Sequence, residues 1–393
     1  MEKHKVVLRA NRANVLEAYH HPWVFSKGLA GKPDLSPGTQ VRVVSQDGRH
    51  LGWGFYHPHN SIAVRMLTFD KDPMDEAVWR KRIRAALELR RTCLDPSQQN
   101  YRLIHGENDG FPGLSVDRYG DLLCMQVVSA GFEIMKADLA VWLREETGAR
   151  AVFERSEGAS RKQEGLPPSK GMLVGDYPFP FEIEEGGLRF AIDPGQGQKT
   201  GFFLDQYRQR QRVASLSRGR RVLDLCCYTG GFTLAALRGG AAHVCSLDSS
   251  AWALEQLQEG LERNGLDPQR QTSVKADVFD WLKHGEEEPF DLVILDPPAL
   301  AKSLRDVERA RMAYRHLNRD AAKFVVSGGQ LFTFTCSGVI DAETFRKSVF
   351  LGLRDARRQG RVVAHFGPGA DHPVDLCFPE GRYFEGLAIY LAA

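Results

Sequence analysis

Residues 222–232 read Val-Leu-Asp-Leu-Cys-Cys-Tyr-Thr-Gly-Gly-Phe. An apolar run with an acid near its end, followed by small residues and a second apolar run, predicts a strand, a tight turn and a helix. A dinucleotide site would place glycines in the turn, because backbone amides must approach a pyrophosphate. Cys226 and Tyr228 stand where such glycines would be, so a phosphate-binding turn is disfavoured. Asp224 suits a cation instead, such as the ammonium of a methionine moiety, or else it caps the helix.

Similar apolar runs recur along the second half of the chain. After residues 221–226 they lie at 243–247, 272–276, 292–295 and 331–334, with helical stretches at 252–264, 305–326 and 342–358. Strands that alternate with helices predict an α/β fold with a doubly wound, mostly parallel sheet. The last two runs, 362–366 and 387–391, have no clear helix between them and are expected to close the sheet as a hairpin. These seven strands resemble the sheet of a class I S-adenosylmethionine methyltransferase.

Acids also end the next two strands. Asp248 follows the second strand, where a carboxylate binds both hydroxyls of a ribose. Asp277 follows the third and can accept a hydrogen bond from an adenine amino group, while Val278 offers an apolar face. Each acid could instead cap a helix. Because ligands of doubly wound sheets bind beyond the carboxyl ends of the strands, three acids there favour a nucleoside with a cationic tail. We therefore expect S-adenosylmethionine as the cofactor.

The fourth and fifth strands end in residues that suit methyl transfer to a base. Asp296 is followed by two prolines, which make a stiff turn. An aromatic residue after such a turn is typical of amino-methylating enzymes, and Ala299 and Leu300 stand there instead. Cys336 follows the fifth strand and faces the same crevice. Addition of a thiolate to C6 of cytosine makes C5 nucleophilic enough to take a methyl group. The alternative is a small core cysteine.

Composition restricts the class of protein. The 393 residues carry a net charge of only +2, and they contain no run of about 18 apolar residues that could span a membrane. The N-terminus lacks the apolar region of a secretory signal. Seven cysteines without a C-x-x-C pair fit a reducing cytoplasm. His20-His21 and His57-Pro58-His59 lack a third ligand, so no metal is expected.

The positive charge is unevenly distributed. Residues 1–72 hold ten Lys and Arg against six Asp and Glu, and they hold six of the twelve histidines. Further basic clusters lie at 80–91 and 208–221. Any one cluster could be a solvated helix face, but three in a nearly neutral chain favour a polyanionic partner.

Changes in periodicity divide the chain into three expected domains. Residues 1–72 read as the short strands of a small β-barrel. Residues 73–185 read as a middle α+β module ordered strand-strand-helix-strand-strand, whose last strand is 179–183 and whose residues 157–171 form an exposed loop. Residues 186–393 form the Rossmann-like domain.

Several segments recur in one order in a known family. They are His21–Phe25, Gly106–Gly113, Val116–Gly120, Lys199–Gln206, Asp296–Pro298, Thr335–Gly338 and Ala370–Val374. Through them the chain resembles the bacterial large-subunit ribosomal RNA cytosine-C5 methyltransferases with an N-terminal PUA domain. The resemblance implies that residues 1–72 are an RNA-binding PUA domain and that Gln206 contacts the cofactor. In the family an arginine follows the glutamine directly. In this chain Tyr207 follows Gln206, and Arg208 comes next. Relatives without the cysteine methylate other base atoms, so Cys336 carries the cytosine assignment.

The expected activity is S-adenosylmethionine-dependent methylation of a cytosine C5 in large-subunit rRNA. Cys336 is the expected nucleophile, and Asp296 binds the N3/N4 edge of the base. The expected cofactor residues are Gln206, Asp224, Tyr228, Gly230, Asp248 and Asp277. The alternatives are an RNA guanine N-methyltransferase, which would not need Cys336, and a non-catalytic RNA-binding protein. The partner is 23S rRNA or a large-subunit assembly intermediate. The sequence leaves open the nucleotide, the base that removes the C5 proton, and the oligomeric state, a homodimer included.

Overall fold

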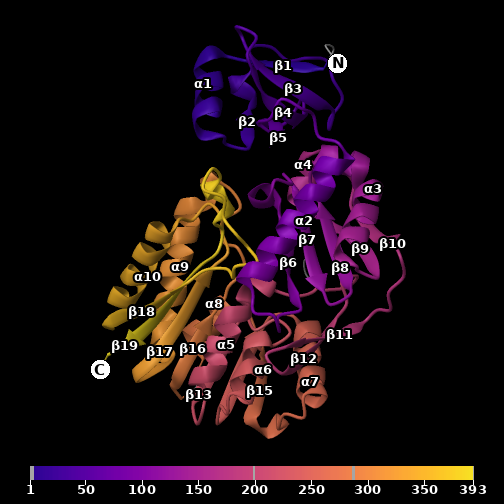
Figure 1. Cartoon of the computed structure of the whole chain (residues 1–393). Helices are drawn as coiled ribbons and strands as arrows, with labels where there is room; N and C mark the ends of the chain where they lie inside the picture. The colour runs from indigo at the N-terminus through magenta and orange to yellow at the C-terminus, as the bar shows by residue number, and fades with distance from the viewer. Residues whose placement is uncertain (1–3, 198–199, 286–287, 393) are drawn as a thin grey trace. The chain divides into compact units, whose positions relative to one another are not determined.

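The computed structural model describes residues 4–197, 200–285 and 288–392 (Figure 1). Lys199 therefore lies outside the described residues. Unit 1 comprises Met1–Ile183, Ile192–Leu204 and Ala370–Gly381, and unit 2 comprises Glu184–Ala191, Asp205–Gly369 and Arg382–Ala393. None of the helices in the described parts of the chain is long and apolar enough to cross a membrane.

Unit 1 begins with a five-stranded sheet in the order β1-β3-β4-β5-β2. Its elements are β1 (Lys5–Leu8), α1 (Ala10–Tyr19), β2 (Trp23–Phe25), the 3₁₀ turn η1 (Ser26–Gly28), β3 (Gln40–Ser45), β4 (His50–Tyr56) and β5 (Ile62–Thr68). A Cβ at Gly54 would lie 2.4 Å from Cγ1 of Val64, so only glycine lets β4 and β5 approach this closely. Leu16 of α1 packs onto the buried face of the sheet with Val41 and Val43.

A second five-stranded sheet, in the order β10-β9-β8-β7-β6, follows in unit 1. Its elements are α2 (Glu76–Cys93), β6 (Asn100–His105), β7 (Leu114–Tyr119), β8 (Leu122–Val127), α3 (Ala130–Thr147), β9 (Ala151–Ser156), α4 (Ala159–Gln163) and β10 (Ser169–Val174). β6 was not predicted from the sequence. The prediction of a loop at residues 157–171 was wrong, because that range holds α4 and the start of β10. Arg161, which looks like a surface residue, is buried and donates to the carbonyl oxygen of Val127 at 3.0 Å.

The strand expected at residues 179–183 lies two residues further along. It is β11 (Phe181–Glu185), and it pairs with β12 (Leu188–Ile192) as a separate two-stranded sheet rather than with β10. The turn between these strands contains Gly186 and Gly187, both with positive φ.

Unit 2 contains a seven-stranded sheet in the order β15-β14-β13-β16-β17-β19-β18. The strands are β13 (Arg221–Leu225), β14 (His243–Asp248), β15 (Gln271–Lys275), β16 (Phe290–Leu295), β17 (Val325–Thr335), β18 (Gly360–Phe366) and β19 (Glu385–Leu391). The first five are parallel, and β19 runs antiparallel between β17 and β18. The expected doubly wound sheet with a terminal antiparallel pair is confirmed.

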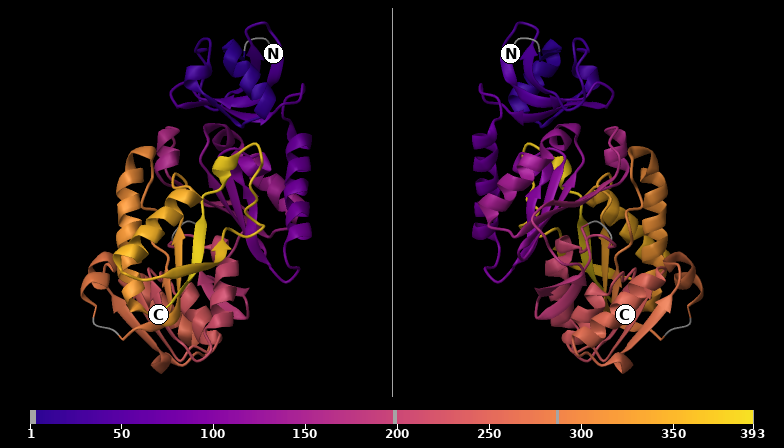
Figure 2. Two further views of the ribbon diagram at one scale, coloured as in Figure 1. Left: turned by 90° about the vertical axis from the view of Figure 1, so that its left-hand side faces the viewer. Right: turned by 90° about the vertical axis from the view of Figure 1, so that its right-hand side faces the viewer.

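Helices cover both faces of this sheet (Figures 1 and 2). They are α5 (Tyr207–Leu216), α6 (Gly231–Arg238), α7 (Ala251–Arg263), α8 (Val278–His284), α9 (Val307–Ala321) and α10 (Ala342–Asp355). Leu223 and Leu295 of the sheet share one core with Leu282 of α8, Leu317 of α9 and Val349 of α10. Helix α9 ends earlier than the expected range 305–326, because a short 3₁₀ turn, η6 (Ala322–Phe324), precedes β17.

Candidate active site

The expected site residues of unit 2 lie along the carboxyl edge of its parallel strands. In the registers of β13 with its two neighbours, Asp224 lies between Ser246 and Ile294. Burial raises the pKa of the Cys226 thiol, and so do the nearby carboxylates, of which Asp296 and Asp248 contribute most. The acids that follow separate strands therefore surround a single turn of the chain.

The turn after β13 contains several residues with positive φ, as a glycine-rich loop would, although most of its residues are not glycine. Cys226 and Tyr228 have φ values of 62° and 49°, and Gly230 has 81°. Positive φ is uncommon for residues other than glycine and is typical of strained functional loops. A Cβ on Gly230 would lie 2.2 Å from Cδ1 of Leu257, so this position also has no room for a side chain.

Asp224 is fully buried beneath this turn. Its Oδ2 accepts a hydrogen bond from the Thr233 hydroxyl at 2.7 Å, and that hydroxyl also lies 2.8 Å from Oγ of Ser246. Among the described residues no donor reaches Oδ1. Burial raises the pKa of Asp224 to about 7. The carboxyl thus contacts the first turn of α6, as the capping alternative expects, and one buried oxygen lacks the donor that a ligand could supply.

Asp248 is oriented by the backbone on both sides. Its Oδ2 accepts from the Tyr228 N–H and its Oδ1 from the Ser250 N–H, both at 2.9 Å. A carboxylate offers about four acceptor positions, so each oxygen can take one more hydrogen bond. The side chain is partly exposed. This arrangement suits two adjacent hydroxyls.

Asp277 forms the hydrogen bonds of a helix cap. Its Oδ1 accepts from the backbone N–H groups of Phe279 at 2.8 Å and Asp280 at 3.2 Å, at the start of α8. Val278 is buried in the core of unit 2. The capping alternative is therefore realised, and a contact with adenine stays a prediction.

Gln206 ends the 3₁₀ turn η3 (Leu204–Gln206) and is buried. Its Nε2 donates to Oδ2 of Asp296 at 2.8 Å. No described donor reaches its Oε1. Gln206, expected at the cofactor, is thus bonded to the acid expected at the base. Arg208, the second residue of α5, is exposed.

Cys336 directly follows β17 and is partly buried. Its Sγ lies 4.0 Å from the carbonyl oxygen of Pro297, the residue after Asp296. Because β16 and β17 pair in parallel, with Leu295 opposite Thr333, the loops that follow them leave the sheet side by side. The structure therefore brings the Asp296 turn and Cys336 together.

Known proteins match the chain over nearly its whole length. A family model for S-adenosylmethionine-dependent methyltransferases matches residues 166–364, and one for PUA-like domains matches residues 6–69. The Ribosomal RNA large subunit methyltransferase I of Shewanella denitrificans is 39% identical over 392 residues, which cover 98% of each chain. The protein of the same name from Photobacterium profundum is 40% identical over 380 residues, 94% of this chain and 95% of the relative. The chain belongs to this methyltransferase family.

Two expectations are confirmed for this methyltransferase. The fold is that of S-adenosylmethionine-dependent methyltransferases with an N-terminal PUA-like domain, and S-adenosylmethionine is the cofactor. The crystal structure of SMU.776 complexed with SAH has the same fold, with a TM-score of 0.86 and 21% identity over 98% of this chain and 99% of that one.

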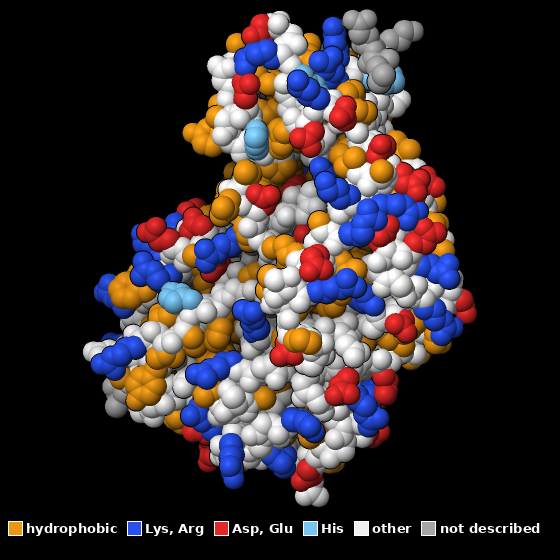
Figure 3. Space-filling model, in the orientation of Figure 1, with side chains coloured by type: hydrophobic (Ala, Val, Ile, Leu, Met, Phe, Trp, Pro, Cys, Tyr) orange, Lys and Arg blue, Asp and Glu red, His pale blue; other side chains and the backbone are white. Residues whose placement is uncertain are grey.

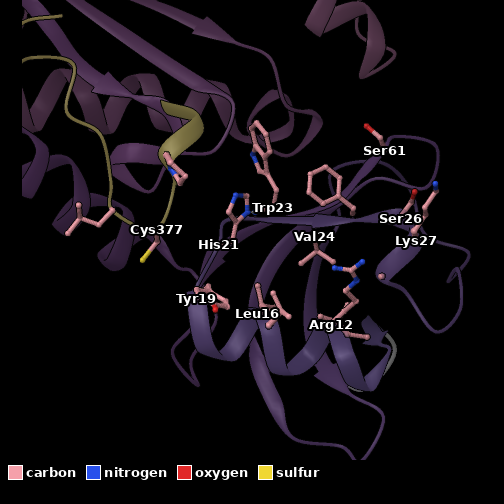
Figure 4. Close-up of a pocket in the computed structure, with 16 residues that line it drawn as sticks. Arg12, Leu16, Tyr19, His21, Trp23, Val24, Ser26, Lys27, Ser61 and Cys377 are labelled. Atoms are coloured by element: carbon pink, nitrogen blue, oxygen red, sulfur yellow. Dashed lines mark hydrogen bonds between the residues drawn. The ribbon is translucent and has the colours of Figure 1, made fainter. Parts of the chain in front are cut away.

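The PUA-like part of the methyltransferase has an apolar groove that the sequence did not reveal. A cavity of about 720 Å³ is lined by α1, β2, η1 and residues 376–379 (Figure 4). The exposed fractions of Tyr19 and Phe25 are 69% and 51%, large values for aromatic residues. Arg12 and Lys27, both exposed, belong to the same lining. The face in Figure 3 likewise shows hydrophobic side chains among Lys and Arg on this domain.

Three arginines of the basic cluster at residues 80–91 pair with carboxylates of neighbouring elements. Arg80 and Arg84 both pair with Glu146, at 3.3 and 2.9 Å. Arg90 is buried and pairs with Asp109 at 2.6 Å. The charges of these three arginines are therefore largely balanced within the fold.

Proposed function

We propose that this methyltransferase transfers a methyl group to C5 of a cytosine in large-subunit rRNA. The relatives' shared name supports the substrate class. The observation that carries the cytosine assignment is the placement of Cys336, whose Sγ lies beside the turn of Asp296. A thiol at this edge supplies the nucleophile that C5 chemistry requires and that amino methylation does not.

Cys336 acts on the base in two steps. Its thiolate adds to C6, and the new S–C6 bond makes C5 electron-rich, so that C5 forms a bond to the methyl carbon. When bound, S-adenosylmethionine would supply that methyl as an electrophile, and the bond between its sulfonium sulfur and the methyl carbon would break to leave S-adenosylhomocysteine. A base then removes the C5 proton, the electron pair re-forms the C5–C6 double bond, and the S–C6 bond breaks to release the thiolate. Asp296 hydrogen-bonds the N3/N4 edge, and Gln206 holds its Oδ2 in place.

The cofactor residues divide by the part of the molecule they bind. Asp224 binds the ammonium through its buried oxygen, and Asp248 binds the two ribose hydroxyls. Asp277 accepts from the adenine amino group in addition to capping α8. Tyr228 and Gly230 shape the turn, with the Tyr228 N–H holding Asp248. Gln206 lies where the cofactor and base regions meet, because its amide contacts Asp296.

The N-terminal domain, residues 1–72, supplies RNA binding away from the reacting base. Arg12 and Lys27 of the groove contact phosphates, while Tyr19 and Phe25 offer flat surfaces to unpaired bases. Phosphate contacts position the protein and carry little sequence information. The substrate is 23S rRNA or a large-subunit assembly intermediate, so the place of action is the bacterial cytoplasm.

The decisive experiment is covalent trapping. RNA that contains 5-fluorocytidine at the target is incubated with the enzyme and S-adenosylmethionine, and adducts are resolved on a denaturing gel. Fluorine cannot leave as a proton does, so the adduct is expected to persist with wild-type protein. Cys336→Ala should lose both adduct and methylation, and Asp296→Asn should slow both. Cys93→Ala, a change at an exposed cysteine, is the matched control and should behave as wild type.

Three results would contradict the proposal. An active Cys336→Ala enzyme would end the nucleophile assignment. Methylated guanine, with no fluorocytidine adduct, would instead identify an RNA guanine N-methyltransferase. Cofactor and RNA binding without any methyl transfer would indicate a non-catalytic RNA-binding protein.

A further inference from the structure

A buried tyrosine hydroxyl links the two residues that flank Cys336. Tyr314 of α9 has no exposed surface. Its hydroxyl lies 2.7 Å from Oγ1 of Thr335 and 3.1 Å from Oγ of Ser337. The backbone on either side of Cys336 is therefore held by one oxygen atom from a different element of the fold.

The same network reaches the turn that carries Asp296. Oγ of Ser337 accepts a hydrogen bond from the Ala301 N–H at 3.2 Å. The Ser337 N–H in turn donates to Oγ1 of Thr335 at 3.2 Å. Ala301 lies five residues after Asp296, so three hydroxyls and two backbone amides join the loops after β16 and β17.

The geometry of the network depends on the phenol oxygen and not on the ring alone. The Tyr314 ring packs edge-on against Phe345, with centroids 5.3 Å apart and an interplanar angle of 85°. A phenylalanine would keep this packing and leave the hydroxyls of Thr335 and Ser337 without their shared partner in a buried site. Burial raises the pKa of Tyr314, which keeps the phenol protonated and able to donate.

We propose that Tyr314 is a positioning residue that sets the place of the Cys336 thiol relative to Asp296 during attack on the base. The inference rests on the proposed function, because it assigns Cys336 as the nucleophile. Tyr314 itself contacts neither base nor cofactor in this role. Attack requires near-contact distances and aligned orbitals, so a small displacement of the sulfur slows the covalent step more than it weakens binding.

The test is Tyr314→Phe in the full-length enzyme. Single-turnover methylation and 5-fluorocytidine adduct formation are measured at saturating RNA and S-adenosylmethionine. Both rates are expected to fall about ten- to a hundredfold. The KM for RNA and the affinity for S-adenosylhomocysteine should stay within about twofold of wild type. Ser348→Ala is the matched control, because it removes another buried hydroxyl, bonded to the carbonyl oxygen of Thr344, and should leave all values unchanged.

A double-mutant cycle tests whether the hydroxyl acts through Thr335. Thr335→Val removes the same hydrogen bond from its other end, together with the one that Oγ1 of Thr335 accepts from the Ser337 N–H. The double variant Tyr314→Phe/Thr335→Val should react within about twofold of the slower single variant, because both changes break one shared network.

Three outcomes would overturn the positioning role. These are a wild-type rate in Tyr314→Phe, multiplicative losses in the double variant, and a loss of cofactor affinity as large as the loss of rate. An active Cys336→Ala enzyme would instead refute the proposed function, and the two failures are therefore distinguishable.

Discussion

Replacing Asp224 with asparagine removes a fully buried carboxyl whose pKa is raised by burial to about 7, from 3.8 for an ordinary aspartate. The folded protein therefore holds this proton more tightly than the unfolded chain does. The stability linked to the proton is complete below about pH 4 and is lost as pH rises through 7. A difference of about three pKa units corresponds to about 4 kcal/mol in the free energy of unfolding.

The assay is urea denaturation of wild type and Asp224→Asn between pH 5 and pH 8, within the same ionic strength. Asparagine keeps the shape and can still accept from the Thr233 hydroxyl, but it does not titrate. Wild type should lose stability relative to the variant across this range. Asp176→Asn, at an exposed position, is the control and should track wild type. Identical pH dependence in wild type and Asp224→Asn would refute the reasoning.

The same carboxyl makes the affinity for the cofactor rise with pH, whereas the stability linked to it falls. An ammonium is bound by the ionised form of Asp224, so the affinity for S-adenosylhomocysteine should rise from pH 5.5 to 7, by at most about tenfold per pH unit. Calorimetric titration should show this rise in wild type and its loss in Asp224→Asn. A flat profile in wild type would place the ammonium elsewhere.

Two further predictions concern the ribose and the RNA. Asp248→Ala should weaken S-adenosylhomocysteine binding about ten- to a hundredfold, since charge-assisted hydrogen bonds contribute about 1.5–3 kcal/mol; unchanged affinity in calorimetry would remove Asp248 from the site. Arg12→Gln with Lys27→Gln should weaken RNA binding and lower the salt slope by about one per lost phosphate contact, measured by fluorescence anisotropy. Arg91→Gln, on the exposed face of α2, is the control and should keep the salt slope. An unchanged slope in the double variant would show that the groove does not contact RNA phosphates.

The fold of unit 2 could be predicted because parallel strands buried on both faces leave a strong trace in the sequence. Runs such as residues 292–295 are continuously apolar, and the helices between them are amphipathic. The strands of unit 1 are less visible. β6 carries Arg102 in its interior, paired with Asp117 of the neighbouring strand, and this charge hides the alternation of a strand.

The site could be predicted only where its residues follow the strands. Asp248, Asp296 and Cys336 share one edge because parallel strands end there, and this follows from topology. Topology does not determine which partner a given side chain contacts. Gln206 and Tyr314 come from η3 and α9, and nothing in their local sequence indicates which carboxylate or hydroxyl they meet. Asp277 shows a further limit of sequence-based prediction. A residue that caps a helix and a residue that binds the cofactor can be the same kind of residue at the same position.

The membership of residues 370–381 in unit 1 has a consequence for the order of events during protein synthesis. The carbonyl oxygen of Asp371 accepts from Nη2 of Arg90 at 2.8 Å, and its carboxylate accepts from the Arg102 N–H at 3.0 Å. The ribosome adds residue 371 only after it has synthesised almost all of unit 2. N-terminal domains commonly fold first as they emerge, but here a nascent chain holds an incomplete first unit, with Arg90 lacking one of its acceptors, until translation is nearly over.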